Sequence, residues 1–133
     1  MALSSLRVLV VDDDFLARSY AKHVLDVAGY DVVGAGSGLE ALQVVKQPPT
    51  FDLFVLDVVM PQMSGTELAR HIRQSSPDAK ILYVTGHSDQ LFTDRGALWE
   101  HEAFIEKPVS PEALREAVSL LLHGTFKNPP AAA

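Results

Sequence analysis

The sequence predicts an α/β fold of the doubly wound kind, in which a five-stranded parallel sheet carries helices on both faces. Short runs of apolar, often β-branched residues alternate five times with segments whose apolar residues recur at helical spacing. The short runs are apolar almost throughout, as expected of parallel strands that are buried on both faces. Right-handed crossover connections between such strands place helices on both sides of the sheet.

The chain opens with a predicted strand, a helix and a second strand. The apolar run at residues 6–11 ends at Asp12. Residues 15–28 carry apolar side chains at helical spacing, and Gly29 fits the C-terminal cap of that helix. Residues 30–33 then form the second predicted strand.

A second helix and a third strand follow. Ser37 precedes Glu40 by three residues, which is the pattern of a capping box and predicts a helix that begins there. The helix must end before Pro48, because proline cannot continue it. Residues 53–56 form the most apolar predicted strand, and Asp57 follows it directly.

The next elements repeat the same rhythm. We expect a helix at about residues 66–74 and a fourth strand at residues 81–84, which ends at Thr85. Residues 88–99 predict a weaker helix, because Gly96 lies inside it and glycine disfavours the helical state.

The last unit is short and well bounded. Residues 103–105 form the fifth predicted strand, and Pro111 fits the first position of a helix over residues 112–122. Gly124 closes that helix, and residues 125–133 are a low-complexity tail rich in proline and alanine.

Composition narrows the function classes. The chain has 133 residues, enough for one domain, and 11 basic against 17 acidic residues, a formal net charge of −6. Without cysteine it has neither disulfides, a thiolate zinc site nor a cysteine nucleophile. The acidic balance argues against binding to nucleic acid or an anionic membrane, and no apolar run is long enough to span a bilayer. With no signal-peptide pattern, we expect a cytoplasmic domain.

Polar residues follow four of the five predicted strands, and Gly34 follows the second. Carboxyl ends of parallel strands meet at one sheet edge, which is where α/β proteins bind ligands. Three or more carboxylates there would repel one another unless a cation neutralised them, and Mg²⁺ suits such oxygen ligands. This composition predicts a metal-assisted phosphoryl site. The residues, in strand order, are Asp12, Asp13 and Asp14, then Gly34, Asp57, Thr85 and Lys107.

Each of these residues also has a simpler interpretation. An aspartate run between a strand and a helix often only caps the helix, and Asp57 could cap the next turn. Thr85 could be a structural hydroxyl, and Lys107 a solvated surface lysine. Their shared position at one sheet edge favours the functional interpretation.

Four motifs at this edge resemble the receiver domain of two-component response regulators, the CheY-like family. They are VLVVDD at residues 8–13, LDVVMP at residues 56–61 with Gly65, VTG at residues 84–86 and EKP at residues 106–108. The similarity spans about residues 6–123. It implies strand order 2-1-3-4-5, a receiver domain at residues 1–124 and a separate tail at residues 125–133.

The resemblance also implies roles for individual residues. Asp57 would be the phosphoacceptor, and its carboxylate would form an acyl phosphate. Asp13, Asp57 and the backbone carbonyl of Val59 would bind Mg²⁺ directly, and Asp12 would bind it through water. Lys107 would pair with the phosphoryl group, and Thr85 would hydrogen-bond to it. The Lys107–Pro108 peptide bond is a candidate for the cis form.

A signalling role follows from the same resemblance. The phosphoryl donor would be a histidine kinase or a histidine phosphotransfer domain. Phosphorylation would draw in Thr85 and Lys107 and change the surface made by residues 88–99, the fifth strand and the last helix. Phe104 occupies the aromatic switch position of the family, although it could be ordinary core. The changed surface would bind a protein target or a second copy. The chain would modify only itself, and we expect no output domain within it.

The sequence departs from the family pattern at several places. Asp14 is expected to play only a minor role, and His87 could tune water access or have no role at all. The turn at residues 100–103 lacks the glycine often found there. Trp99 could be a binding anchor if exposed or a core residue if buried.

The sequence also suggests three rival functions. The glycines at residues 34–38 suggest a dinucleotide site, but they follow the second strand, and Leu39 stands where glycine or alanine is required. A phosphohydrolase of the haloacid dehalogenase class needs a second aspartate where Val59 stands. A degenerate receiver that only binds partners would not need the complete set of site residues.

Overall fold

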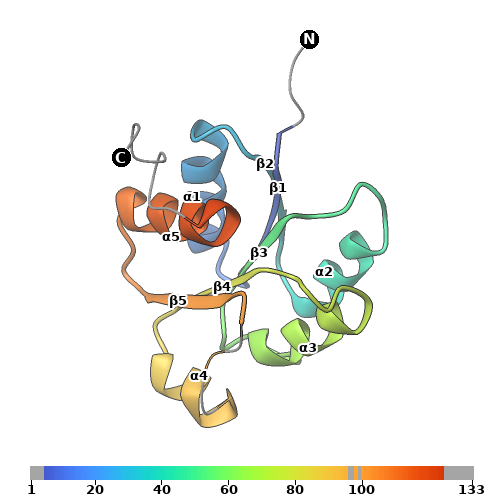
Figure 1. The fold of residues 1–133 in the computed structure, drawn as a ribbon. Coiled ribbons are helices and arrows are strands. Elements are labelled where there is room, and N and C mark those ends of the chain that lie inside the picture. The colour runs from blue at the N-terminus through green and yellow to red at the C-terminus, as the bar shows by residue number, and fades with distance from the viewer. Residues whose placement is uncertain (1–4, 96–97, 99, 125–133) are drawn as a thin grey trace.

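The fold is a single five-stranded parallel sheet with strand order β2-β1-β3-β4-β5 and helices on both faces (Figure 1). This confirms the predicted fold class and strand order. The computed structural model describes residues 5–95, 98 and 100–124. The predicted tail at residues 125–133, Gly96 and Trp99 lie outside the described residues.

Strands and helices alternate along the whole described chain. The strands are β1 (Arg7–Val11), β2 (Asp31–Ala35), β3 (Leu53–Leu56), β4 (Ile81–Thr85) and β5 (Glu102–Glu106). The helices are α1 (Phe15–Val27), α2 (Gly38–Val45), α3 (Gly65–Ser75), α4 (Ser88–Arg95) and α5 (Pro111–His123).

Successive residues of each strand point into two separate cores. Helices α2, α3 and α4 cover one face of the sheet, and α1 and α5 cover the other (Figure 1). In β1, Leu9 and Val11 belong to the first core, and Val8 and Val10 belong to the second. Because both faces are buried, the strands need apolar residues at every position, which is the pattern seen in the sequence.

Polar side chains cap the helix starts. Asp14, Ser37, Ser64 and Ser110 each accept a hydrogen bond from a backbone N–H in the first turn of α1, α2, α3 and α5 respectively. Such caps satisfy backbone donors that have no partner within the helix. They fix where each helix begins after its strand and therefore shape the loops at one sheet edge.

Some local predictions are corrected by the structure. Ser37 caps α2 as expected, but the Glu40 carboxylate accepts from the Gly36 N–H and not from Ser37. The complete capping box lies instead at the start of α3, between Ser64 and Glu67. Strand β2 extends to Ala35, and α3 begins at Gly65, one residue before the predicted start.

The turn before β5 takes a shape that normally suits glycine. His101 has φ 67°, in the left-handed region where side chains other than glycine are disfavoured. Its carbonyl accepts from the Ile81 N–H at 2.9 Å, next to the Ile81–Glu102 pair that begins the β4–β5 ladder. A hydrogen bond of the sheet therefore holds the turn in this conformation.

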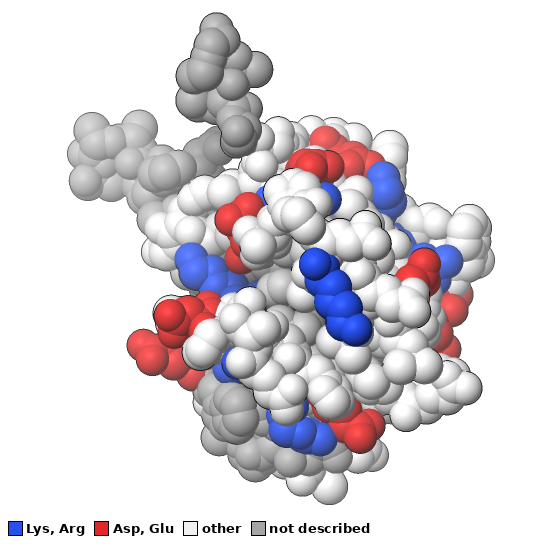
Figure 2. Space-filling view, turned by 90° about the vertical axis from the view of Figure 1, so that its right-hand side faces the viewer, with Lys and Arg blue, Asp and Glu red and all other residues white. Residues whose placement is uncertain are grey.

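Charges on the outside are mixed. On the face turned toward the viewer in Figure 2, which is the right-hand side of Figure 1, basic and acidic side chains lie scattered among uncharged ones. Within the described part of the chain, the helices are all too short or too polar to cross a lipid bilayer.

Candidate functional site

The sheet itself positions the predicted site residues at one edge. The Asp57 N–H donates to the Val11 carbonyl at 3.0 Å, and the Lys107 N–H donates to the Thr85 carbonyl at 3.0 Å. These bonds continue the parallel ladder one residue beyond β3 and β5. Asp57 and Lys107 are therefore held by the rigid sheet, although both stand where a loop begins.

Three carboxylates gather at this edge. One oxygen from each of Asp12, Asp13 and Asp57 lies within 4.8 Å of the other two. Asp12 and Asp57 are buried, with 6% and 8% of their surface exposed, and Asp13 is exposed. A cluster of hard oxygen donors that opens to solvent on one side has the ligand chemistry of a Mg²⁺ site.

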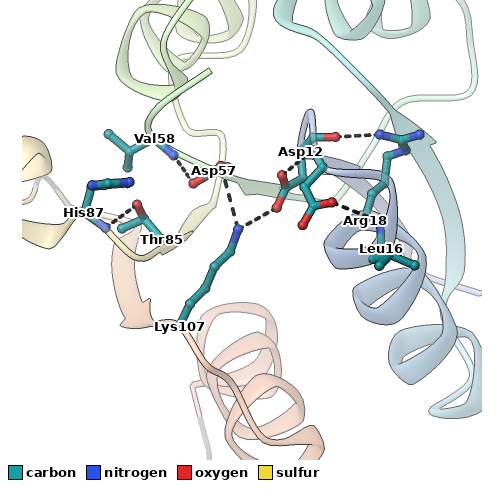
Figure 3. Close-up of polar contacts among 9 residues, drawn as sticks. Asp12, Leu16, Arg18, Asp57, Val58, Thr85, His87 and Lys107 are labelled. Carbon is teal, nitrogen blue, oxygen red and sulfur yellow. Dashed lines mark hydrogen bonds and ion pairs between the residues drawn. The ribbon is translucent and has the colours of Figure 1, made fainter. Parts of the chain in front are cut away.

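Lys107 is the cation that faces this cluster (Figure 3). Its Nζ lies 2.8 Å from Oδ2 of Asp12 and 3.7 Å from Oδ2 of Asp57. Burial on its own lowers the pKa of Lys107, but the hydrogen bond to Asp12 and the charges of Asp57, Asp12 and Asp14 outweigh it and raise the pKa. Lys107 therefore stays protonated and bridges the two buried carboxylates.

The two oxygens of Asp57 are in different environments. Oδ1 accepts a 2.8 Å hydrogen bond from the Val58 N–H. Oδ2 faces Lys107 at a distance longer than a hydrogen bond. Burial raises the pKa of Asp57, and the negative charge of Asp12 raises it further, while Lys107 and the Val58 N–H act in the opposite direction. The site thus holds one oxygen fixed and leaves the other available.

A close backbone approach fixes the loop that follows Asp57. The Gly65 N–H donates to the Val58 carbonyl at 2.8 Å. A Cβ atom at Gly65 would lie 2.0 Å from the carbonyl oxygen of Asp57, closer than atoms can pack. Glycine is required here because the start of α3 passes directly over the backbone of Asp57.

Thr85 is fully buried at the end of β4. Its hydroxyl oxygen accepts from the His87 N–H at 2.9 Å (Figure 3), and the His87 carbonyl accepts from the N–H groups of Gln90 and Leu91 in α4. The hydroxyl thus helps to shape the turn into α4, which matches the simpler structural interpretation. It is also well placed to link a change near Asp57 to that helix.

Phe104 lies half-buried on β5 in register with Tyr83. Its ring packs edge-on against Phe92 of α4, with 5.1 Å between the ring centroids and an 86° angle between the planes. The ring therefore contributes to the core between β5 and α4. Its role as a switch stays a prediction.

The remaining predicted residues are placed as follows. Asp14 caps α1, so helix capping accounts for one of the three consecutive aspartates. Val59 lies in the loop between Asp57 and α3 and is 45% exposed, and the role of its carbonyl as a ligand stays a prediction. His87 is exposed beside Thr85, and the Lys107–Pro108 peptide bond is cis.

Arg18 is a site neighbour that sequence reasoning missed. Its guanidinium donates to the Asp12 carbonyl at 2.7 Å and so holds the backbone of the acidic cluster (Figure 3). A Cβ at Gly34 or Gly36 would lie 3.4 or 3.3 Å from the Arg18 side chain, so the glycines leave it room. The sequence contains this arginine and both glycines, but only the folded structure shows that they lie side by side.

Comparison with known proteins identifies the family. Residues 8–119 match the family model described as "Response regulator receiver domain". The transcriptional regulatory protein YrkP of Bacillus subtilis is 39% identical over 112 residues, which cover 84% of this chain and 47% of YrkP. The sensor kinase CckA of Brucella abortus is 34% identical over 119 residues, 89% of this chain and 13% of CckA. The chain thus spans about half or less of the length of these relatives.

Solved structures agree in fold and in sequence. The response regulator protein TrrA of Thermotoga maritima, crystallised in complex with Mg²⁺ and BeF, superposes with a TM-score of 0.76 at 35% identity. The match covers 88% of this chain and 99% of TrrA.

Proposed function

This chain belongs to the response regulator receiver domain family, and on that premise we propose that Asp57 accepts a phosphoryl group from a histidine kinase or a histidine phosphotransfer protein. The domain then acts as a switch in two-component signalling. It catalyses only its own modification, so it turns over no separate substrate.

The proposal rests on the different environments of the two carboxylate oxygens of Asp57. Oδ1 is held by the Val58 N–H, and Oδ2 lies 3.7 Å from Nζ of Lys107, beyond hydrogen-bond distance, at the three-carboxylate cluster. A nucleophile needs one lone pair aimed at the incoming phosphorus and a fixed orientation. Asp57 meets both requirements, because the sheet fixes its backbone and Val58 fixes its rotation.

The reaction is a transfer between two nucleophiles. Oδ2 of Asp57 attacks the phosphorus in line with the phosphorus–nitrogen bond of the donor phosphohistidine. A carboxyl oxygen–phosphorus bond forms, the phosphorus–nitrogen bond breaks, and the imidazole leaves with its electron pair and takes up a proton. The product is an aspartyl phosphate.

The acidic cluster fits a divalent cation. Three carboxylates against one ammonium leave the site with a surplus of negative charge and exposed oxygen ligands. We propose that Asp12, Asp13, Asp57 and the Val59 carbonyl hold Mg²⁺. When bound, the ion neutralises the charge of the phosphoryl oxygens. The TrrA neighbour was crystallised with Mg²⁺, which supports this choice.

Lys107 and Thr85 supply the remaining contacts. Lys107 already points between Asp12 and Asp57, so it needs only a small rotation to pair with a phosphoryl oxygen. The Thr85 hydroxyl can donate to the same group while its oxygen accepts from His87. These contacts draw the ends of β4 and β5 toward Asp57.

The output is proposed to leave through the surface made by α4, β5 and α5. Two contacts support this coupling. Ser88, the first residue of α4, donates to the Glu106 carboxylate at the end of β5. Phe104 packs on Phe92 of α4. Movement at Thr85 and Lys107 therefore changes how α4 rests on β5, and a protein target or a second copy senses that change.

The test is phosphorylation by a small donor. With acetyl phosphate and Mg²⁺, the wild-type chain should gain about 80 Da, the mass of one phosphoryl group. The Asp57→Asn variant should show no gain. Asp78→Asn, an exposed aspartate before β4, is the matched control and should label like the wild type.

Two results would overturn the proposal. The first is the absence of any mass gain in the wild type at saturating donor and Mg²⁺. The second is a gain that persists in Asp57→Asn, which would move the acceptor to another residue.

A further inference from the structure

An apolar pocket of about 650 Å³ adjoins the phosphoacceptor site. It lies between α1, the carboxyl-terminal part of the sheet and the start of α5. Its apolar lining includes Val10, Val55 and Val84 from the sheet, Ala17 and Ala21 from α1, and Leu114 from α5. This volume lies within the range of small-molecule sites, and phosphoryl transfer to Asp57 makes no use of the apolar lining.

The pocket owes its shape to small side chains and to one hydrogen bond. Ala17 and Ala21 leave space where larger residues of α1 would meet the sheet. The Tyr20 hydroxyl donates to the Val109 carbonyl at 2.8 Å and so ties α1 to the loop before α5. This hydrogen bond fixes the position of α1 relative to the loop before α5, so the pocket keeps its shape without a ligand.

The mouth of the pocket is charged. Asp12, Asp14 and Asp57 line it together with Lys107, so three carboxylates face one ammonium. Lys107 donates to Asp12 at 2.8 Å and lies 3.7 Å from Oδ2 of Asp57, too far for a hydrogen bond, so that oxygen has lone pairs that can accept from a second ammonium. An anionic head group would have to approach three carboxylates, whereas a cationic one finds an acceptor.

We propose that this pocket binds a small hydrophobic amine, with the apolar body between α1 and the sheet and the ammonium against Oδ2 of Asp57. This oxygen is also the proposed nucleophile, so the amine would block phosphorylation; that consequence, but not the binding itself, rests on the proposed function. The site is then a point at which a metabolite of this class can silence the switch.

The test uses three probes that share an eight-carbon chain: octylammonium, octan-1-ol and octanoate. Each is titrated into the unphosphorylated, ¹⁵N-labelled chain in EDTA, without phosphodonor. Octylammonium should cause saturable shifts at the amides of Ala17, Ala21 and Val84. It should bind about tenfold more tightly than octanoate, because the mouth attracts one charge and repels the other.

Three variants connect this binding to the pocket. Ala17→Leu fills the pocket and should weaken octylammonium binding about tenfold. Ala28→Leu adds the same side chain at the exposed end of α1 and should bind like the wild type. Asp57→Asn should remove most of the preference for octylammonium over octan-1-ol, and it decides the matter if Ala17→Leu fails to fold.

Equal binding of all three probes, or shifts confined to residues outside the pocket, would overturn the proposal. So would unchanged binding in a folded Ala17→Leu variant. Because these titrations contain no phosphodonor, failure of Asp57 to become phosphorylated would leave their outcome unchanged. Failure of amine binding would equally leave the phosphorylation test intact.

Discussion

Strand β1 has a charged cluster at each end, and the two clusters use their charges differently. At the amino end, Arg7 donates through Nε to Asp31 at 3.0 Å, and its backbone N–H donates to Asp52 at 2.7 Å. The Arg7 guanidinium also donates to the Pro49 carbonyl and lies 4.4 Å from the centre of the Phe51 ring. Each carboxylate there has its own donor, and an aromatic ring lies against the cation.

At the carboxyl end the balance is reversed. Asp12, Asp13 and Asp57 bring their oxygens within 4.8 Å of one another, and Lys107 is the cation that reaches two of them. The amino-end cluster links β1 to β2 and to the loop before β3. The carboxyl-end cluster keeps an excess of negative charge. The same residue types therefore stabilise the fold in one place and create a reactive site in the other.

The largest expected effect comes from the backbone beneath the reactive cluster. Gly65→Ala should lower the free energy of unfolding by about 3 kcal/mol, because the new Cβ would lie 2.0 Å from the Asp57 carbonyl oxygen and force α3 away. Gly86→Ala is the matched control, since a Cβ there meets nothing within 4 Å. Urea denaturation measures both, and a Gly65→Ala variant as stable as Gly86→Ala would contradict the close approach.

The amino-end cluster should affect stability alone. Arg7→Ala removes the hydrogen bonds to Asp31 and Pro49 and the contact with Phe51, and should cost about 2 kcal/mol of unfolding free energy. Labelling by acetyl phosphate at 25 °C should stay at the wild-type level. A loss of labelling in the folded variant would show that the two ends of β1 are coupled.

The carboxyl-end cluster should respond to metal. Lys107→Met keeps the aliphatic chain but removes the ammonium that bridges Asp12 and Asp57. Without Mg²⁺ the variant should lose about 1 kcal/mol of stability through carboxylate repulsion. Saturating Mg²⁺ should recover that loss relative to the wild type, because the site without the Lys107 ammonium is more negative and binds the cation more tightly, and a bound cation stabilises the folded state. Arg7→Ala, the comparison variant, keeps the whole acidic cluster, so Mg²⁺ should stabilise it as much as the wild type and leave its deficit relative to the wild type unchanged.

The sequence predicted the sheet well because its strands are buried on both faces. Strand β3 needed apolar residues at every position, so its bounds at Leu53–Leu56 were predicted correctly. Helix starts were less certain, since serine and aspartate favour caps and loops alike. The complete capping box at Ser64 was missed for that reason, and the one expected at Ser37 lacks its reciprocal bond.

The acidic site was predictable in its membership but not in its internal geometry. Parallel strands bring their carboxyl ends together, so Asp12, Asp57 and Lys107 had to meet at one edge. Which oxygen of Asp57 the Val58 N–H holds depends on a side-chain rotation that no sequence pattern encodes. The same is true of Arg18, whose side chain reaches the Asp12 carbonyl while lying beside Gly34 of β2 and Gly36 just after that strand.

The smallest expected effect tests whether the ionised form of Asp57 destabilises the folded state. Burial and the charge of Asp12 raise the pKa of Asp57, so the folded state disfavours its ionised form. A raised carboxyl pKa gives stability that is complete below the ordinary aspartate pKa and is lost as pH rises through the folded value. Asp57→Asn removes that loss. In EDTA at neutral pH, the variant should therefore be more stable than the wild type by about 0.5 kcal/mol, a modest amount because water screens the site.

The difference should shrink as the pH falls and vanish below about pH 4, where both side chains are neutral. Urea denaturation of the two proteins across this pH range measures it, and Asp78→Asn, an exposed aspartate, provides the baseline. A wild type that is more stable than Asp57→Asn at neutral pH would mean that attraction to Lys107 outweighs burial and the repulsion from Asp12. In that case the carboxyl-end cluster would stabilise the fold as the Arg7 cluster does, and the two ends of β1 would not differ in this respect.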